Sequence, residues 1–310
     1  MVALAFAVAC SIAIGVIFKQ AGRRQLDRTA LLTVNYAAAV GVAVLLLAIG
    51  GRSVEEGLTL SASLVALGVG TGGVLIAGFF ALAWATEVAG MSLAIGVMRV
   101  SVVVPFLASW WVWGEVPTPA QGVGMVLAAA AFFLLAHRRS APAPVPAGDA
   151  PAPDRTAPIQ MAAAPSVDWH AAGVLTLTFC LGGAVDVSMK AFEEGFGAGN
   201  SRVLFLMMAF GVAFLVGAAI VLRRGMRRGR WPTGETIAWG LLLGVVNYGS
   251  LEFLLRAIEV LPGPFVFPAN NIAIMTFAAL LGVIVWGEHL SRANRIGLVL
   301  AGIALLLLGL

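Results

Sequence analysis

The sequence predicts an all-helical membrane protein in which ten transmembrane helices form two inverted repeats of five. Composition is the first reason, because 60% of the 310 residues are hydrophobic and only 11% are charged, whereas soluble domains carry about 25% charged residues. The second is a series of ten apolar segments, each close to the roughly 20 residues that cross a bilayer as a helix. The third is an internal match between the two halves, which indicates duplication of one unit.

The apolar segments alternate with connections that are mostly short and carry glycine, proline or charge, so successive helices should be antiparallel. The first segment lacks a basic leader and a small-residue cleavage site, which favours a transmembrane helix over a signal peptide. In chain order, the predicted helices are Val2–Phe18, Ala30–Ile49, Leu60–Thr86, Ser92–Trp113, Ala120–Ala136, Ala171–Met189, Val203–Leu222, Thr236–Ala257, Phe265–Trp286 and Arg295–Leu310.

The duplication is clearest near the end of each half, where Trp113-Gly114-Glu115 recurs as Trp286-Gly287-Glu288. A hydroxyl, an amide and a glycine follow each copy at matching positions: Thr118, Gln121 and Gly124, then Ser291, Asn294 and Gly297. We therefore assign residues 1–139 to the first repeat and residues 168–310 to the second. Between them, residues 140–167 are rich in alanine and proline, which predicts an extended, flexible tether.

The distribution of charge predicts that the second repeat is inverted. Five helices is an odd number, so the second copy must enter the membrane from the opposite side. The loop after the second helix holds one basic residue, Arg52, whereas its counterpart after the seventh holds five. Fourteen of the 19 Lys and Arg residues lie in odd-numbered loops and four in even-numbered ones. The positive-inside rule thus places the odd loops in the cytoplasm and both termini outside.

At this point the sequence resembles a known family. The pattern Gly-Glu-x2-hydroxyl-x2-amide-x2-Gly that closes each half is similar to the EamA-type repeat of the drug/metabolite transporter superfamily. Further stretches resemble a less-studied branch of that superfamily: Ile17-Phe18-Lys19, Val34-Asn35-Tyr36, Ser101–Pro105 and Phe267–Asn271. The resemblance implies a five-plus-five inverted-repeat fold with a central cavity and the export of small metabolites or drugs. It also implies cytoplasmic termini, the opposite of what the charges predict.

Arg99 is the strongest candidate for chemistry. It lies about seven residues into the fourth predicted helix, roughly 10 Å deep. An arginine at that depth costs a few kcal/mol and normally faces a partner or a wet cavity. No carboxylate lies three or four residues away, so the partner must come from another helix or from the substrate. The alternatives are a structural ion pair and a cationic anchor for a carboxylate or phosphate.

Asn270 and Asn271 are the second candidates. By the repeat alignment Arg99 corresponds to Ile272, immediately after them, so the fourth and ninth helices bring polar groups toward the midplane from opposite faces. Pro268 should free a backbone carbonyl there, as is typical of transporter sites. We expect a gap of about 10 Å between the two depths for substrate. The alternative is that the asparagines join helices.

The eighth predicted helix carries a polar stripe, since Tyr248, Glu252, Arg256 and Glu259 follow each other at helical spacing, with Asn247 beside them. Tyr248 and Asn247 are expected to contact substrate. Glu252 either forms an intrahelical pair with Arg256 or carries a coupling proton, and it is also expected to neutralise Arg99 in the empty state.

The sixth predicted helix has an i, i+4 pair, Asp186 and Lys190. Asp186 is expected at the interface, with proton coupling as the alternative, and Lys190 is expected to anchor the helix end. Glu115 should cap a helix N-terminus rather than touch substrate. Finally, Gly68-x3-Gly72 and Gly240-x3-Gly244 occupy corresponding helices, and this spacing predicts close helix–helix approach.

Together these features predict a transporter that moves a small metabolite, anionic or amino-acid-like, across the cytoplasmic (inner) membrane by alternating access, in the direction of export. The alternatives are an exporter of drugs or lipid intermediates, and a non-transporting membrane receptor or assembly protein. We expect no enzymatic activity, because the metalloprotease, hydrolase and P-loop motifs are missing. No metal or cofactor and no nucleic-acid partner are expected; the partners are the substrate and the bilayer, with a monomer or homodimer.

Overall fold

The computed structural model describes residues 1–49, 60–136, 169–229, 231–287 and 291–310. The predicted linker, 140–167, and Glu288 lie outside these residues. Throughout the described ranges the regular structure is helical, and strands are not found in them. The first half contains α1 (Val2–Arg23), α2 (Arg28–Ile49), α4 (Ala62–Ala89), α5 (Met91–Val100), α6 (Val103–Trp111) and α7 (Pro119–Ala136). The second contains α8 (Trp169–Phe196), α9 (Arg202–Arg228), α10 (Gly234–Val260), α11 (Gly263–Trp286) and α12 (Arg292–Leu308).

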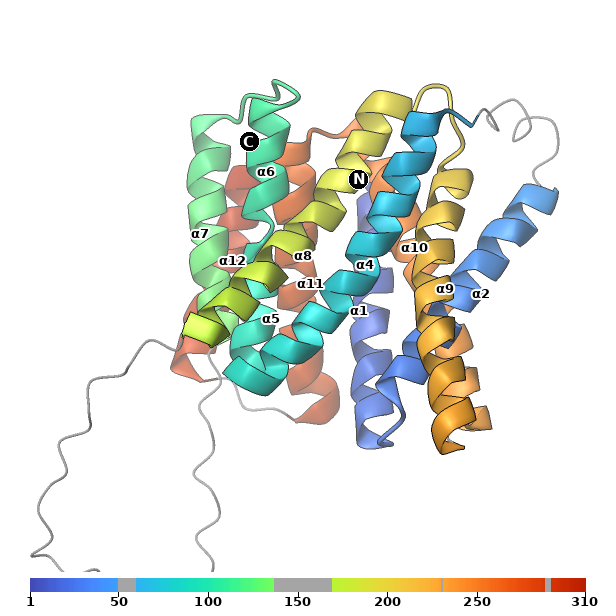
Figure 1. Ribbon diagram of the computed structural model, residues 1–310. Coiled ribbons are helices and arrows are strands. Elements are labelled where there is room, and N and C mark those ends of the chain that lie inside the picture. The colour runs from blue at the N-terminus through green and yellow to red at the C-terminus, as the bar shows by residue number, and fades with distance from the viewer. Residues whose placement is uncertain (50–59, 137–168, 230, 288–290) are drawn as a thin grey trace, which may run out of the picture.

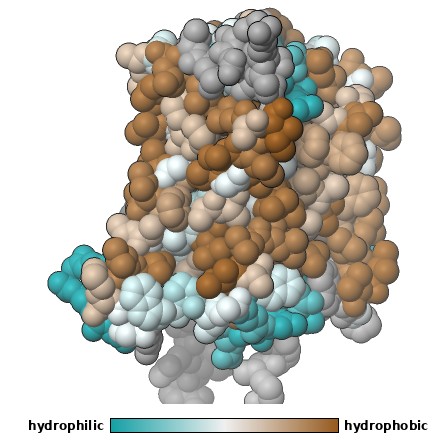
Figure 2. All heavy atoms as spheres, turned by 90° about the vertical axis from the view of Figure 1, so that its right-hand side faces the viewer, coloured by the Kyte–Doolittle hydropathy of each residue, from teal (hydrophilic) through white to brown (hydrophobic). Residues whose placement is uncertain are grey.

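Within the described residues, eight apolar stretches are long enough to cross a membrane, with α5 and α6 counted together as Leu93–Trp111. These stretches indicate a multi-pass membrane protein, as the composition predicts. The two described helices outside this set are α7, with 18 residues, and α12, with 17. Figure 2 shows a hydrophobic belt on the side of the molecule over α2, α9 and α10, with hydrophilic side chains along its lower edge. Such a belt matches the hydrocarbon core of a bilayer.

The predicted fourth helix is broken into α5 and α6, whereas the apolar pattern predicts one continuous helix. Figure 1 shows α5 and α6 one above the other, joined by Ser101 and Val102. Pro105 explains the break, because it has no N–H to offer the Ser101 carbonyl and its ring crowds that carbonyl. The Ser101 carbonyl instead accepts from the Val104 N–H at 2.9 Å, a tighter turn than an α-helix allows.

The two glycine pairs permit close packing, which confirms that prediction. A Cβ on Gly72 of α4 would lie 2.4 Å from the Ala209 carbonyl oxygen of α9, and one on Gly244 of α10 would lie 2.3 Å from the Asn35 carbonyl oxygen of α2. Only glycine avoids these clashes. Helix α9 therefore packs against the glycines of α4, and α2 packs against the glycines of α10.

The repeated hydroxyl and amide fasten α7 to α12. The Thr118 Oγ1 accepts the Gln121 backbone N–H at 3.2 Å, and the Ser291 Oγ accepts the Asn294 backbone N–H at 3.1 Å, so each hydroxyl caps its own helix. The side-chain amides then cross over. Gln121 Nε2 donates to the carbonyl of Leu308 at 3.4 Å, and Asn294 Nδ2 donates to the carbonyl of Leu135 at 3.3 Å.

These crossed bonds join the start of each helix to the end of the other, so α7 and α12 are antiparallel. They also satisfy carbonyls that a helix C-terminus would otherwise leave unpaired. The repeat glycines lie in the same contact, since a Cβ on Gly124 would come within 3.2 Å of the Ala304 carbonyl oxygen and one on Gly297 within 3.3 Å of the Ala131 carbonyl oxygen. The sequence signature is therefore a helix-pairing device.

Candidate functional site

Arg99 and Asn271 meet at the break between α5 and α6. Arg99 is in the last turn of α5, and its Nη1 donates to Asn271 Oδ1 of α11 at 3.1 Å. The sequence placed these two side chains at opposing depths with a gap of about 10 Å between them, and this is wrong. The broken helix lets the guanidinium reach α11 directly.

The Asn271 amide is oriented by its own helix. Its Nδ2 donates to the Phe267 carbonyl at 3.1 Å, which turns the amide oxygen toward Arg99. Pro268 lies inside the same turn of α11. Asn271 is 8% exposed and is thus buried together with the partner it accepts from. The contact joins two helices and leaves most of the five guanidinium N–H groups of Arg99 free of Asn271.

Asp186 of α8 supplies the charge that opposes Arg99. The two groups interact electrostatically with each other, and both are partly buried. Two glycines bring α8 close to the helix break. A Cβ on Gly182 would lie 2.7 Å from Ser101 Oγ, and one on Gly183 would lie 2.5 Å from Val104 Cβ. Asp186 follows Gly182 by one turn and so lies on the face of α8 that packs against the break.

This placement corrects the interpretation of Asp186 as an interfacial partner of Lys190. Lys190 Nζ instead lies 2.7 Å from Glu115 Oε1 and 2.6 Å from Glu194 Oε1. Its side chain is 1% exposed, so it is a buried fastening and not the interfacial anchor that the sequence predicted. The signal was present in the sequence as Glu115 of the repeated Gly-Glu, but nothing indicated which cation would meet it.

Glu115 caps a helix N-terminus, as expected, although the helix is α11 and not the one that follows it. Its Oε2 accepts the Gly263 backbone N–H at 2.8 Å, while Oε1 holds Lys190. Glu115 therefore joins the connection between α6 and α7 to α8 and α11 at once. A carboxylate is favourable there because the first N–H groups of a helix carry partial positive charge.

The polar stripe on α10 belongs to a different cluster. Glu252 Oε1 accepts from Arg256 Nε at 2.8 Å, which is the intrahelical pair considered for these residues. Nearby, Arg202 at the start of α9 lies 3.1 Å from Glu193 and 2.6 Å from Glu259. The expectation that Glu252 neutralises Arg99 is not supported, because Asp186 holds that place.

Six buried side-chain atoms have no hydrogen-bond partner among the described residues: Asn35 Nδ2, Ser109 Oγ, Tyr248 Oη, Glu252 Oε2, Asn270 Oδ1 and Thr276 Oγ1. Tyr248 is 3% exposed, and its ring packs against Phe210 of α9 with centroids 6.2 Å apart. A buried polar atom without a partner is costly, so such atoms mark places where a polar ligand or water can bind. Asn247 has a helix-joining contact, since its Nδ2 donates to Asn35 Oδ1 of α2 at 3.2 Å.

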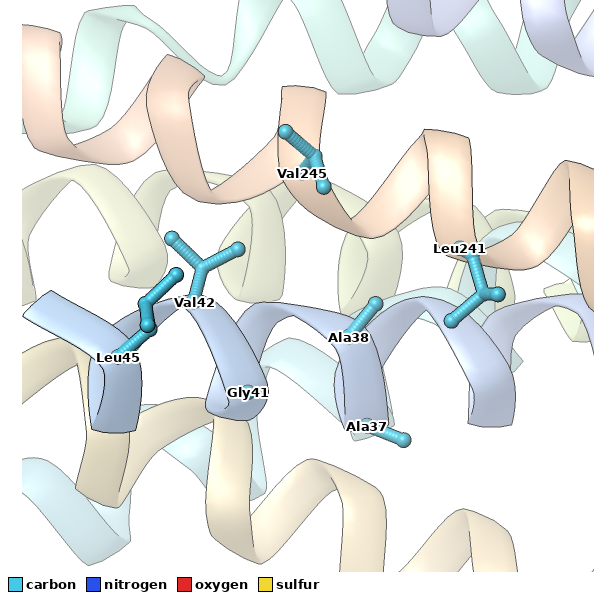
Figure 3. A pocket seen from close by; sticks show the side chains of 7 residues that line it. All are labelled: Ala37, Ala38, Gly41, Val42, Leu45, Leu241 and Val245. Atoms are coloured by element: carbon cyan, nitrogen blue, oxygen red, sulfur yellow. The ribbon is translucent and has the colours of Figure 1, made fainter.

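An apolar groove is lined by none of these polar groups. It has a volume of about 400 Å³ and runs between α2 and α10, where Figure 3 shows Ala37, Ala38, Gly41, Val42 and Leu45 opposite Leu241 and Val245. None of the sequence-predicted site residues lines it. Within the described residues, groups of three or more His, Cys, Asp or Glu side chains that could hold a metal ion are also not found.

Comparison with known proteins supports the fold. No protein-family model matches the chain. A relative from Haemophilus influenzae (strain ATCC 51907 / DSM 11121 / KW20 / Rd), described as an uncharacterized protein, is 24% identical over 303 residues that cover 96% of this chain and 93% of the relative. A solved crystal structure is similar with a TM-score of 0.72 at 15% identity, over 98% of this chain and 94% of that chain. At that identity the likeness shows a shared fold, so an experimentally determined protein of nearly the same length has this arrangement of helices.

Proposed function

We propose that the protein is an alternating-access transporter for a small anionic metabolite, built as ten transmembrane helices in two inverted five-helix repeats like those of EamA-type members of the drug/metabolite transporter superfamily. The single observation that carries the proposal is the contact of Arg99 with Asn271 at the break between α5 and α6. It places a cation at a helix discontinuity between the two halves of the chain, which is where transporters bind their substrates.

The packing of the helices supports the inverted repeat. Under the sequence match, α1, α2, α4, α5–α6 and α7 correspond to α8, α9, α10, α11 and α12. Contacts then occur in matched pairs: α1 packs on α10 as α8 packs on α4, and α2 packs on α10 as α9 packs on α4. The last helices of the two proposed repeats, α7 and α12, are antiparallel and contact each other through reciprocal amide bonds from matching positions.

The surroundings of Arg99 support an anionic substrate. Its direct hydrogen-bond partner is a neutral amide, and the core around the break is apolar, with Val102, Phe106, Val266 and Ile272 all buried. A guanidinium in such a place binds a carboxylate with two parallel hydrogen bonds at little cost in side-chain entropy. One positive charge suits a monoanion better than a doubly charged phosphate.

The buried ion cluster at Lys190 bears on alternating access, because it joins the two proposed repeats on one side of the molecule. The cluster of Lys190, Glu115 and Glu194 ties α8 to the connection between α6 and α7, on the same side as the ends of α8 and α6. In this conformation it holds together elements of both repeats. We assign the protein to the cytoplasmic membrane with the basic odd-numbered loops in the cytoplasm, as the positive-inside rule requires.

The test is ligand-dependent stabilisation of the purified protein, since a ligand that binds only the folded state raises its unfolding temperature. Pyruvate, malate, inorganic phosphate, glucose and choline form the panel. We expect pyruvate, a monoanion, to raise the unfolding temperature of wild type more than the dianion malate does. Arg99→Lys should weaken this response by at least about tenfold in apparent affinity, because it keeps the charge and loses the planar fork.

Arg99→Gln should abolish the response, whereas Arg228→Gln, at an exposed arginine in the last turn of α9, serves as the matched control and should leave it intact. A wild-type response in Arg99→Gln would contradict the proposal. So would stabilisation by glucose or choline alone. Arg99→Gln could also be unstable, with its stability restored in Arg99→Gln/Asp186→Asn. If the anion response is still missing from that double variant and from Arg99→Lys, Arg99 is a structural charge and the proposal is wrong.

A further inference from the structure

With Arg99 protonated and Asp186 ionised, the Arg99 region is electrically neutral when it holds no substrate. Arg99 contributes one positive charge, Asp186 contributes one negative charge, and Asn271 contributes none. A monoanion bound to Arg99 would therefore leave one uncompensated negative charge in the interior. Moving such a charge through the low-dielectric part of a membrane costs at least a few kcal/mol.

Asp186 is the group placed to remove that charge. It lies one turn beyond Gly182, where α8 approaches the α5–α6 break so closely that a Cβ on Gly182 would meet Ser101 Oγ at 2.7 Å. It therefore lies near enough for its charge to act on Arg99, and an anion bound at Arg99 would compete with it for the same positive charge. Once the anion occupies the guanidinium, the Asp186 carboxylate loses its counter-charge.

The other charged groups on the elements around Asp186 are already engaged or distant. On α8 itself, Lys190 is held by Glu115 and Glu194, and Glu193 is paired with Arg202. Helix α6 carries no titratable residue, and the one charge on α5 is Arg99.

The two remaining neighbours are α4 and α10. On α4 the one charged residue is Glu87, which is exposed in its last turn, far from the break. On α10, Glu252 is bonded to Arg256, Glu259 is paired with Arg202, Glu235 lies at the opposite end beside Arg24, and Tyr248 packs on Phe210.

We infer that the protein carries each monoanion together with a proton: the anion binds Arg99, and the proton binds the carboxylate that the anion displaces, Asp186. This inference rests on the proposed function and names its coupling. An O–H bond forms on the Asp186 carboxyl with a proton from water on the side where the anion enters. That bond breaks, and the proton returns to water, when the anion leaves and the Arg99–Asp186 interaction re-forms.

Such a cycle is electroneutral in both of its crossing steps. The empty carrier crosses as Arg99 with ionised Asp186, and the loaded carrier crosses as Arg99, the anion and neutral Asp186. Transport should consequently respond to a pH gradient and ignore the membrane potential. Without the Asp186 carboxylate, the empty carrier would bear a net positive charge, so its return would become sensitive to the potential.

The experiment uses the full chain reconstituted in liposomes, with radiolabelled pyruvate as the probe and protein-free liposomes as the background. A pH-sensitive dye inside reports proton movement, and valinomycin with a potassium gradient sets the potential. Wild type should move a proton with each pyruvate, and its rate should change less than about twofold when a potential is imposed. Asp186→Asn should move pyruvate without protons and respond at least about tenfold to the same potential, since 100 mV acting on one charge is worth roughly 2.3 kcal/mol.

Asp186→Glu keeps a titratable carboxyl and should keep proton movement, and Glu87→Gln is the matched acidic control that should behave as wild type. Pyruvate movement by wild type without protons, or with a strong response to potential, overturns the inference and leaves the proposed function standing. This outcome needs no variant, so a misfolded Asp186→Asn does not protect the idea. Loss of coupling in Glu252→Gln with coupling retained in Asp186→Asn also overturns it. Failure of every anion tested to bind or move overturns the proposed function itself.

Discussion

Two cations in the interior of this protein differ in how completely nearby carboxylates neutralise their charge. Lys190 is 1% exposed and lies within 2.7 Å of two carboxylates, one of which also caps α11. Arg99 has a neutral amide as its hydrogen-bond partner and a carboxylate that acts on it electrostatically. Both lie where the two halves of the chain meet, and both join α8 or α11 to the first half.

Under the proposed function, the difference separates a structural charge from a substrate-binding one. The Lys190 ammonium has three N–H donors, and short bonds to Glu115 and Glu194 take two of them. The Arg99 guanidinium has five N–H donors and gives one to Asn271. A charge that is fully compensated by the protein holds helices together, whereas a charge with spare donors can exchange one partner for a ligand.

The largest effect should come from breaking the fully compensated cluster. Lys190→Met keeps the length of the side chain but leaves Glu115 and Glu194 facing each other without a cation. We expect a loss of about 3–5 kcal/mol in the free energy of unfolding, as is typical when one partner of a buried ion pair is removed. Thermal unfolding of the purified protein measures the loss.

The double variant Lys190→Met/Glu115→Gln sharpens this prediction. It removes one of the two carboxylates that lost their cation, so part of the lost stability should return. If the double variant is less stable than Lys190→Met, the cap on α11 contributes more than the ion pair, and the comparison between the two cations would need that correction.

A smaller effect is expected where α8 approaches the helix break. Gly182→Ala places a Cβ within 2.7 Å of Ser101 Oγ, so α8 must shift away from Arg99 or Ser101 must rotate. We expect overpacking to cost about 1–3 kcal/mol in unfolding free energy. The Lys190 cluster lies two turns farther along α8 and should be little disturbed. We therefore expect Gly182→Ala to lose a larger fraction of its anion affinity than of its unfolding free energy.

Gly173→Ala is the matched control for this substitution, since nothing lies within 4 Å of a Cβ at that position of α8. It should leave both the unfolding temperature and anion binding close to wild type. Equal losses of binding in the two variants would show that helix flexibility, and not the approach to the break, governs the site.

Hydrogen bonds between neutral groups should stabilise helix contacts less than the Lys190 ion cluster does, and the α7–α12 pair tests this. Gln121→Ala and Asn294→Ala each remove one crossed bond to a helix end. We expect each to cost about 0.5–1.5 kcal/mol in unfolding free energy. The costs should add, because the two bonds lie at opposite ends of the helix pair. Chemical denaturation of the single and double variants in detergent checks both values, and strong coupling between them would contradict independent bonds.

The smallest effect is expected at an exposed pair. Arg24 and Glu235 form a salt bridge whose side chains are 53% and 46% exposed, and Arg24 also lies over the Trp239 ring at 5.5 Å. Glu235→Gln should change unfolding free energy by less than about 1 kcal/mol, with the difference reduced further by salt. A larger loss of unfolding free energy would contradict the view that this exposed ion pair contributes little to stability.

Much of the fold could be predicted from the sequence because apolar length and glycine spacing are local properties. Helix lies along the predicted segments, with the fourth broken into α5 and α6, and eight apolar stretches of the described residues are long enough to span a membrane. The pairs Gly68–Gly72 and Gly240–Gly244 lie at close helix contacts. The break in the fourth segment was missed, although Pro105 was in view. A proline within an apolar run lowers the cost of a kink, but neighbouring helices decide whether the chain turns there.

Partner choice was the part that local pattern could not supply. Arg99 and Asn271 were expected to share one site, yet their direct contact depends on the broken helix. The i, i+4 rule allows Lys190 to pair with Asp186 or with Glu194, and the structure pairs it with Glu194 and with Glu115, which lies 75 residues earlier in the chain. A spacing rule gives the pairs a helix allows, and tertiary packing selects among those pairs and all others.

The crossed amide bonds between α7 and α12 have an evolutionary consequence. In that contact each copy offers the other the same surface, so it is isologous in the way that a two-fold dimer interface is. A chain encoding one half would carry everything needed to pair with a second copy of itself, provided that the copy sat in the membrane the other way up. A single gene ancestor would then have inserted in both orientations. Under the proposed duplication, fusion of two copies would have removed that requirement and would have allowed Arg99 and Asp186, which occupy unlike positions in the proposed repeats, to arise on one side of the dyad alone.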